Sequence, residues 1–289
     1  MTRPDFRRWR RFLVALAFLP ACVLAQAQGA KEEFTPEVGQ IGKDVIWVPT
    51  PEFLVERMLQ MAQVGPGDLV VDLGSGDGRT VIAAAKKFQA SSMGVEFNPD
   101  MVALSRRNAA KEGALDRAKF IEGDIFAVDF TKATVVTVYL LPDLNMRLRP
   151  QILDMKPGTR LVSHQFTMGD WQPDETSNFD GRSAYFWVVP AKVEGNWKLS
   201  YAVNGGRTEQ LLNLTQKFQI IEGGIVSGST RLGLRDVSLH GDRLDFTWID
   251  DHGVLREFSG RVRGDVMEGQ MKTGGKSGGR WRAQRAPVV

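Results

Sequence analysis

The stretch VDLGSGDGRT, residues 71–80, places three glycines at every second position after an acidic residue. It follows a short apolar run and precedes a segment with helical character. Because glycine has no side chain, a turn built on Gly74, Gly76 and Gly78 lets the backbone approach a ligand closely. The helix after the turn directs the positive end of its dipole at that ligand. The stretch therefore predicts a strand, a ligand-binding turn and a helix.

Acidic residues recur at the ends of the predicted strands. Asp72 ends the first strand, Glu96 ends the second, and Asp124 follows the third. A carboxylate at the position of Glu96 accepts hydrogen bonds from ribose hydroxyls in nucleotide-binding crevices. Asp124 is placed to meet the edge of an adenine. The sequence thus predicts a nucleotide site at one edge of a sheet.

Strand and helix signals alternate up to residue 190. A helix is expected after Thr50, which we expect to cap it, with Pro51 at its first position. Two further helices are expected over residues 78–88 and 98–113. Strands are expected at residues 69–71, 93–96, 120–121, 134–141, 160–166 and 183–189. This alternation predicts an α/β fold with a doubly wound, mostly parallel, Rossmann-like sheet.

Two other ligand classes fit the glycine-rich turn less well. A nicotinamide dinucleotide site requires glycine at the sixth position of the fingerprint, where this chain has Arg79. A P-loop requires a closing Lys-Ser or Lys-Thr pair, which is missing here. A tight turn without a ligand is a third interpretation, but it leaves the carboxylates at the strand ends unexplained.

These motifs resemble those of class I S-adenosylmethionine-dependent methyltransferases over roughly residues 45–190. Val48-Pro49-Thr50-Pro51 and Gly94-Val95-Glu96 are similar to the seven-strand protein-lysine methyltransferases, in particular the ATP synthase c-subunit lysine methyltransferases. The non-SET histone lysine methyltransferase shares the Gly-Val-Glu stretch. The resemblance implies S-adenosyl-L-methionine as cofactor. The cofactor-binding residues that it implies are Thr50, Asp72, Gly74, Ser75, Gly76, Gly78, Glu96 and Asp124.

The loop after the fourth strand reads Tyr139-Leu140-Leu141-Pro142 and departs from the Asn/Asp-Pro-Pro-Tyr motif of base-amino methyltransferases. Tyr139 and Asp143 are the candidates to contact the methyl acceptor, although a strand-end aromatic and a helix-cap aspartate explain them equally well. The acceptor is unidentified, and a protein lysine amine is one candidate. His164 is interpreted as a structural histidine. None of the three histidines has metal-ligand spacing, so no metal is expected.

The first 27 residues have the composition of a secretory signal peptide. Five arginines precede an apolar run over residues 12–24 that ends in Ala25-Gln26-Ala27. Cleavage there leaves 32 basic and 33 acidic residues, so no nucleic-acid partner is expected. We therefore expect a periplasmic or secreted protein. Lipidation at Cys22 and an uncleaved anchor facing the periplasm stay open as alternatives, and such an anchor is the only membrane contact expected.

The chain changes character near Pro190. Residues 191–289 hold 16 of the 30 glycines and only one of the 13 prolines. Short runs of alternating apolar residues, with turn residues every 8–12 positions, predict an antiparallel sheet of about eight strands that closes into a small barrel. Gly195-x-Trp197 and a late arginine resemble lipocalin-like barrels, in which an arginine covers the tryptophan. The expected domains are residues 28–190 and 191–289.

Three functions compete on this sequence. The first is an exported S-adenosylmethionine-dependent methyltransferase. The second is a non-catalytic envelope binding protein on a methyltransferase-like fold. It is considered because a charged sulfonium nucleotide does not diffuse across membranes, which leaves the supply of the cofactor outside the cytoplasm unexplained. The third is a dinucleotide oxidoreductase, which Arg79 disfavours. The intact set of motif residues favours the enzyme.

Overall fold

The computed structural model describes residues 34–43, 46–203, 205–227 and 230–287. The signal peptide expected over residues 1–27 lies outside these residues. Within them, no helix is long and apolar enough to cross a membrane.

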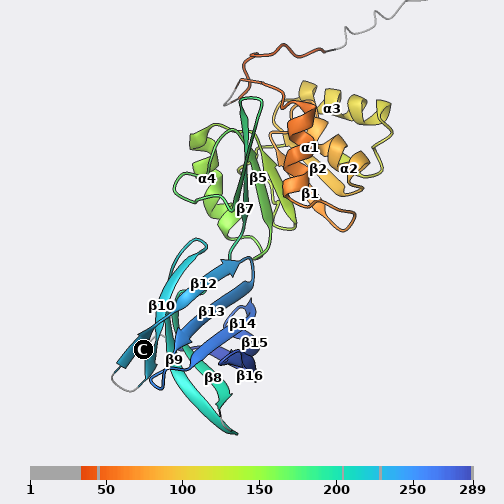
Figure 1. The fold of residues 1–289 in the computed structure, drawn as a ribbon. Helices are drawn as coiled ribbons and strands as arrows, with labels where there is room; N and C mark the ends of the chain where they lie inside the picture. The colour runs from red at the N-terminus through yellow and green to blue at the C-terminus, as the bar shows by residue number, and fades with distance from the viewer. Residues whose placement is uncertain (1–33, 44–45, 204, 228–229, 288–289) are drawn as a thin grey trace, which may run out of the picture. The chain divides into compact units, whose positions relative to one another are not determined.

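The first sheet contains seven strands of the described chain in the order β3-β2-β1-β4-β5-β7-β6 (Figure 1). The first five strands run parallel, β7 is antiparallel to β5, and β6 is antiparallel to β7. Their bounds are β1 Leu69–Leu73, β2 Ser91–Glu96, β3 Ala118–Glu122, β4 Val135–Val138, β5 Arg160–His164, β6 Glu175–Phe179 and β7 Arg182–Val188. The predicted mostly parallel, Rossmann-like sheet is confirmed.

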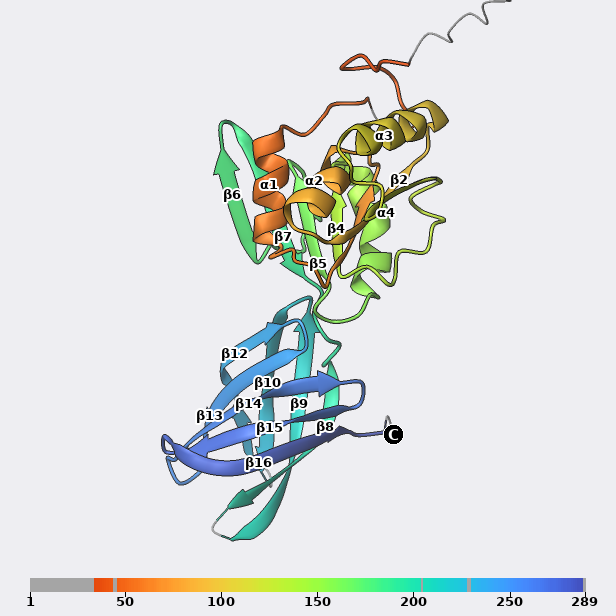
Figure 2. The same ribbon diagram turned by 90° about the vertical axis from the view of Figure 1, so that its right-hand side faces the viewer.

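Helices cover both faces of this sheet, because successive residues of a strand point to opposite sides. Val71 packs with the apolar side chains of α4, whereas Val70 packs with those of α1. Figure 2 shows α1 running beside β7. The helix bounds are α1 Glu52–Met61, α2 Arg79–Lys87, α3 Pro99–Lys111 and α4 Pro142–Leu153.

Three local expectations from the sequence differ from the structure. Pro51, not Thr50, is the N-cap of α1, because the Thr50 hydroxyl instead meets His164 Nδ1 at 3.0 Å. The fourth strand is shorter than expected, since the chain leaves the sheet after Val138. Helix α4 and strand β6 were not among the expected elements. Pro150 inside α4 interrupts the pattern by which a helix is recognised.

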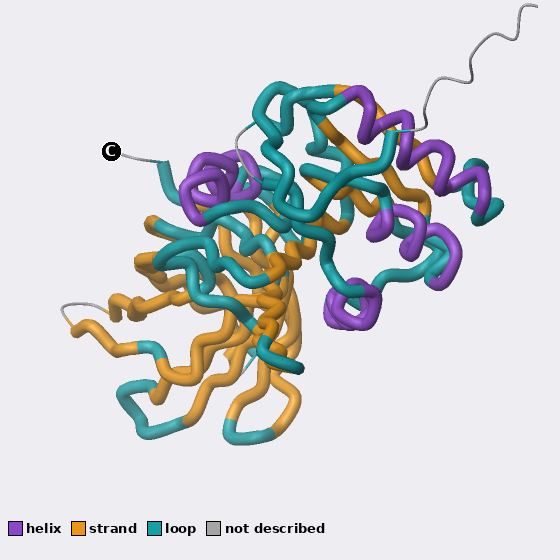
Figure 3. The backbone as a smooth tube through the Cα atoms, turned by 90° about the horizontal axis from the view of Figure 1, so that it is seen from above, coloured by secondary structure: helices purple, strands orange, loops and turns teal. Residues whose placement is uncertain are grey.

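The second sheet is antiparallel and contains nine strands of the described chain, rather than about eight, in the order β11-β10-β9-β8-β16-β15-β14-β13-β12. Figure 3 shows strands and loops without helices in this part. The predicted barrel-like arrangement is confirmed. The bounds are β8 Gly195–Val203, β9 Gly206–Lys217, β10 Ile220–Ser227, β11 Thr230–Gly233, β12 Arg235–His240, β13 Arg243–Ile249, β14 Leu255–Arg263, β15 Val266–Thr273 and β16 Lys276–Arg285.

One side of the second sheet encloses an aromatic core. Trp197, Phe246 and Trp248 are almost fully buried there, and the rings of Trp248 and Phe258 stack with centroids 4.4 Å apart. The guanidinium of Arg285 lies 4.2 Å from the centre of the Trp197 ring. This contact joins the last strand to the first, and it is the arginine-on-tryptophan contact that the lipocalin-like resemblance implied.

Candidate active site

A cavity of about 300 Å³ lies at the carboxyl ends of β1, β2 and β4. Parallel strands bring these ends to the same edge of the sheet, which is where ligands bind in open α/β folds. Seven of the eight cofactor-binding residues predicted from the sequence line the cavity: Thr50, Asp72, Gly74, Ser75, Gly76, Glu96 and Asp124. The structure therefore brings together residues that are up to 74 positions apart in the chain.

Gly76 shows why the turn needs a residue without a side chain. Its backbone is left-handed, with φ at 54°. A Cβ atom added there would lie 2.8 Å from the indole nitrogen of Trp47. A larger residue would therefore force the turn and the Trp47 side chain apart, and both of them line the cavity.

Gly78 is the predicted cofactor residue that does not line the cavity. It is the N-cap of α2, has φ at 83°, and donates its N–H to the Ser75 carbonyl. A Cβ added to it would lie 2.7 Å from both Phe120 Cε1 and Ser105 Cβ. Gly78 therefore allows the turn to pack closely against the side chains of Phe120 and Ser105.

The substitution Gly78→Ala should therefore destabilise the fold. The added methyl group meets two buried neighbours at once, and the residue must keep a left-handed φ that alanine disfavours. Overpacking of this kind costs about 1–3 kcal/mol. Urea unfolding of the variant and the parent measures the difference. Gly113→Ala is the matched control, because Gly113 also has positive φ but nothing lies within 4 Å of its added Cβ. Equal losses in the two variants would contradict the packing argument.

The carboxylate of Glu96 is held in place by backbone donors. Oε2 accepts the N–H of Gly76 at 3.0 Å, and Oε1 accepts the N–H of Asn98 at 2.9 Å. Each carboxylate oxygen has a second lone pair available, so Glu96 retains acceptor capacity toward the cavity. This arrangement fits the predicted role of accepting two ribose hydroxyls.

Asp72 is a buried carboxylic acid that has no cationic partner among the described residues. Only 7% of its surface is exposed, and Oδ1 accepts the Thr137 hydroxyl at 2.6 Å. Burial, with a smaller effect of the nearby negative charges of Glu96 and Asp77, raises its pKa to about 7. A positively charged ligand in the cavity would relieve this cost.

Asp77 and Arg79 hold the turn to the segment before α1. Arg79 makes an ion pair with Asp77 at 2.6 Å and donates to the Thr50 carbonyl at 2.9 Å. The arginine that disfavours a dinucleotide fingerprint therefore has a structural contact. Because its charge is satisfied by Asp77, it does not neutralise Asp72.

Asp124, the residue predicted at the adenine edge, is bound on both sides. Oδ1 accepts the N–H of Phe126, and Oδ2 pairs with Lys43 Nζ at 2.8 Å. The hydrogen bond from Lys43 is the main reason that the pKa of Asp124 is lowered. The Lys43 ammonium also lies 4.4 Å from the centre of the Phe97 ring.

The sequence motifs gave no indication of the segment that contains Lys43. Its described residues supply one wall of the cavity, and Gln40, Lys43 and Trp47 all line it. Backbone hydrogen bonds fold the segment back on itself, from Gly39 N–H to the Trp47 carbonyl and from Trp47 N–H to the Gln40 carbonyl. These residues lack the spacing that marks a strand or a helix, so only the fold reveals their position.

Tyr139 lies on the cavity wall, whereas Asp143 does not. The Tyr139 ring packs on His164 with centroids 3.8 Å apart. His164 is fully buried, and its Nε2 has no hydrogen-bond partner among the described residues. Burial, and after it the charge of Arg182, lower the pKa of His164 to about 4. This histidine is therefore neutral at physiological pH and supports Tyr139 from behind, as a structural residue would.

The charges that line the cavity fit S-adenosylmethionine. Ser75 lines the cavity, and its buried hydroxyl, which lies against Gly94, has no hydrogen-bond partner among the described residues. Asp72 and Glu96 have no cationic partner there either, and the cofactor carries a sulfonium and an ammonium group. The described part of the chain contains no group of three or more His, Cys, Asp or Glu residues that could hold a metal ion.

Comparison with known proteins identifies the class. The ANTKMT methyltransferase domain matches residues 72–175. A protein-lysine N-methyltransferase of Saccharolobus islandicus is 42% identical over 50% of this chain and 94% of its own length. The rat ATP synthase c-subunit lysine N-methyltransferase is 38% identical over 45% of this chain and 60% of its own length.

A solved structure adds the bound product. An RNA methyltransferase from Salinibacter ruber in complex with S-adenosyl-L-homocysteine is 47% identical, with a TM-score of 0.50. The match covers 50% of this chain and 96% of that chain. The fold and the site thus define an S-adenosylmethionine-dependent methyltransferase, which confirms the predicted enzyme class and cofactor. Within that class, the chain belongs to the family of the Saccharolobus protein-lysine N-methyltransferase.

Proposed function

We propose that the protein transfers a methyl group to the lysine amine of a protein. When bound, S-adenosylmethionine would supply a methyl group activated by its sulfonium. Transfer to a neutral lysine nitrogen would break the S–CH3 bond and release S-adenosylhomocysteine and a proton. The chain has to align that nitrogen with the methyl group and to exclude water. Tyr139 lies on the cavity wall and presents an aromatic ring of the kind that attracts cations.

The charge of the cavity carries this proposal. Four carboxylates and two basic groups line it, and the bases Lys43 and Arg79 are already paired with Asp124 and Asp77. Asp72 and Glu96, which the cofactor contacts, leave the lining of the cavity net negative. A negative lining repels a phosphate backbone and does not repel a lysine side chain.

RNA is the competing acceptor, because the similar Salinibacter protein is named an RNA methyltransferase. Residues 28–190 hold 17 basic and 22 acidic groups, and a surface of this balance is not the basic footprint of a nucleic-acid-binding domain. The related proteins from Saccharolobus and rat are named as lysine methyltransferases. Both observations support a protein acceptor.

The test is a methyl-transfer assay with radiolabelled S-adenosylmethionine. Three acceptors are compared: protein extract from the source organism, the same extract with its lysines blocked by reductive dimethylation, and total RNA. We expect label in the untreated extract alone, recovered as methyl-lysine after acid hydrolysis. Label in RNA, or equal label in the blocked extract, would contradict a lysine acceptor. A Glu96→Ala variant serves as the control for transfer that does not depend on this site.

We also propose that the protein works outside the cytoplasm as two domains, residues 28–190 and 191–289. The basic head, the apolar run and the small residues before Gln28 support removal of residues 1–27. The end of β7 at Val188 and the start of β8 at Gly195 support the domain boundary. Sequencing the N-terminus of protein recovered from a bacterial envelope fraction tests the export. A start at Gln28 is expected, whereas an intact Met1 in the membrane would show an anchor instead.

A further inference from the structure

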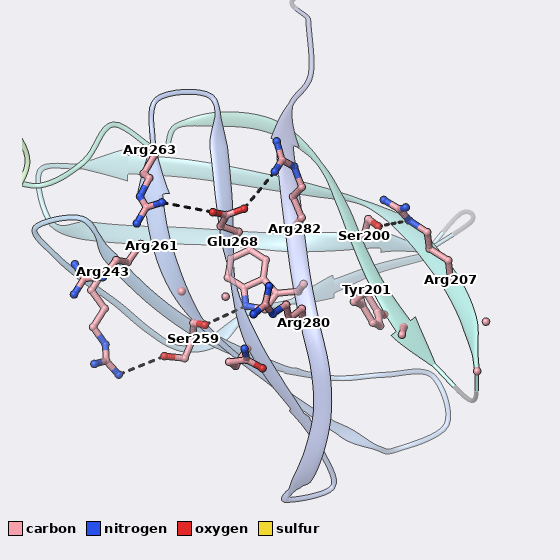
Figure 4. Close-up of a pocket in the computed structure, with 17 residues that line it drawn as sticks. Ser200, Tyr201, Arg207, Arg243, Ser259, Arg261, Arg263, Glu268, Arg280 and Arg282 are labelled. Atoms are coloured by element: carbon pink, nitrogen blue, oxygen red, sulfur yellow. Dashed lines mark hydrogen bonds and ion pairs between the residues drawn. The ribbon is translucent and has the colours of Figure 1, made fainter.

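A groove of about 820 Å³ lies on the second sheet and shares no residue with the cofactor cavity (Figure 4). Strands β8, β9 and β13–β16 form it. Its walls hold one acidic residue, Glu268, and six basic ones, which are Arg207, Arg243, Arg261, Arg263, Arg280 and Arg282. Most of the aromatic core lies on the opposite side of these strands, although Tyr201 and Trp281 reach the groove walls. None of these arginines lines the cofactor cavity.

The strand register aligns the charged residues in rows across the sheet. Arg243 pairs with Arg261, Arg261 with Glu268, and Glu268 with Arg282. In the next row Gln270 pairs with Arg280. Arg282 pairs with Ser200, whose hydroxyl accepts a hydrogen bond from Arg207 Nε at 2.7 Å. Paired residues of an antiparallel sheet hold their Cβ atoms about 4.5–5.5 Å apart, so these positions form a continuous basic surface.

The protein neutralises this surface only in part. Glu268 is shared between Arg263 at 3.7 Å and Arg282 at 3.3 Å, as Figure 4 shows. Arg280 has no acidic partner among the described residues. Arg243 and Arg261 stand directly opposite one another, and like charges in that position destabilise a sheet.

The acids that pair with the remaining arginines lie outside the groove. Asp245 pairs with Arg243, Asp242 pairs with Arg261, and Glu209 lies 3.9 Å from Arg207. None of these three acids lines the groove walls. The arginines of these three pairs are more than half exposed, and exposed ion pairs contribute little stability. An incoming anion can therefore compete for these arginines.

We propose that this arginine groove binds an acidic segment of a partner protein. The guanidinium group matches a carboxylate with two parallel hydrogen bonds, and all six basic groups of the groove are arginine rather than lysine. The groove volume lies in the range that encloses a short ligand segment. This proposal goes beyond the methyltransferase function and does not rest on it.

Nucleic acid and lipid fit the groove less well. The aromatic residues on its walls, Tyr201 and Trp281, are 5% and 2% exposed, so they offer no face on which a base could stack. Its walls contribute no exposed large apolar side chain that could enter a lipid layer. Carboxylates on an extended peptide are the anions that this combination of shape and charge favours.

The experiment measures fluorescence anisotropy of a labelled decaglutamate peptide with the full chain at low salt. The test variant is Arg207→Glu/Arg280→Glu. Its matched control is Lys132→Glu/Lys156→Glu, which makes the same charge change at exposed residues outside the groove. The basic N-terminal segment is present in every protein, so it contributes equally. We expect the test variant to raise the Kd at least about tenfold, because charge-assisted hydrogen bonds are lost. The control should bind like the parent.

Two further arms keep the result decisive. Arg207→Gln/Arg280→Gln repeats the test if the charge reversal does not fold by circular dichroism. A short DNA duplex and phosphatidylglycerol vesicles compete against the peptide. Equal Kd values for the parent and a folded arginine variant would overturn the proposal. Tighter groove-dependent binding of the duplex or of the vesicles than of the peptide would overturn the assignment to an acidic protein segment.

Discussion

Replacing Glu96 with alanine should weaken the binding of S-adenosylmethionine by at least about tenfold and up to several hundredfold. The reason is that the Glu96 carboxylate is fixed by the N–H groups of Gly76 and Asn98, with lone pairs left for two ribose hydroxyls. Hydrogen bonds to a charged group contribute about 1.5–3 kcal/mol each. Isothermal titration calorimetry of parent and variant measures the loss.

Two further variants separate binding from folding and from turnover. Glu96→Gln keeps one carbonyl acceptor, so its loss of affinity should lie between parent and alanine. Asp143→Ala should leave cofactor binding intact, because Asp143 is exposed and does not line the cavity. Circular dichroism confirms that each variant is folded. Cofactor binding by folded Glu96→Ala at the affinity of the parent would refute the ribose assignment.

The Asp72→Asn variant should be more stable than the parent without cofactor, by up to about 4 kcal/mol above pH 7. Burial raises the pKa of Asp72 from an ordinary 3.8 to about 7, so the folded protein bears the cost of a buried charge at high pH. Asparagine removes that charge and still offers an oxygen to the Thr137 hydroxyl. The same change should weaken cofactor binding, because it removes a negative charge from the cavity. Thermal unfolding with and without S-adenosylhomocysteine measures both effects.

The pH dependence of stability gives an independent check. Because the pKa of Asp72 is raised on folding, its contribution favours the folded state below pH 3.8 and is lost as the pH rises toward 7. His164 acts in the opposite direction. Its pKa falls from 6.5 to about 4 on folding, so its contribution is present above pH 6.5 and is lost as the pH falls toward 4.

The two slopes oppose each other in the parent and should partly cancel between pH 4 and 6.5. In the Asp72→Asn variant only the contribution of His164 remains, so the free energy of unfolding should rise with pH between pH 4 and 6.5. A variant that gains nothing over the parent at pH 8 would show that Asp72 is not the buried charge described above.

The sequence indicates which strand ends meet at the cavity because the relevant signals are local. Asp72 and Glu96 each end an apolar strand, and parallel pairing brings such ends together whatever the rest of the fold. The glycine spacing likewise marks the turn directly. The same local reasoning placed Gly78 with the ligand, although the contact that requires a glycine there comes from Phe120 and Ser105.

The remaining contacts join residues that are far apart in the chain, so no spacing of residues in the sequence predicts them. Lys43 reaches Asp124 across 81 positions, and Thr50 meets His164 across 114. Charge and hydroxyl groups are common on any surface, so neither pair can be identified from the sequence. The arginine groove is similar. Arg280 and Arg282 stand two positions apart in the sequence, but their proximity to Arg207 and Arg243 arises only from strand pairing.

A catalytically active fragment of this protein is expected to need the cavity wall formed by Gln40, Lys43 and Trp47. The family match begins at residue 72, after that wall. A fragment of residues 72–175 would keep Asp72 and the other acids of the cavity. It would lack the indole against Gly76, the cation at Asp124 and all of β7. The region that matches the methyltransferase family is therefore shorter than the region that completes the cavity.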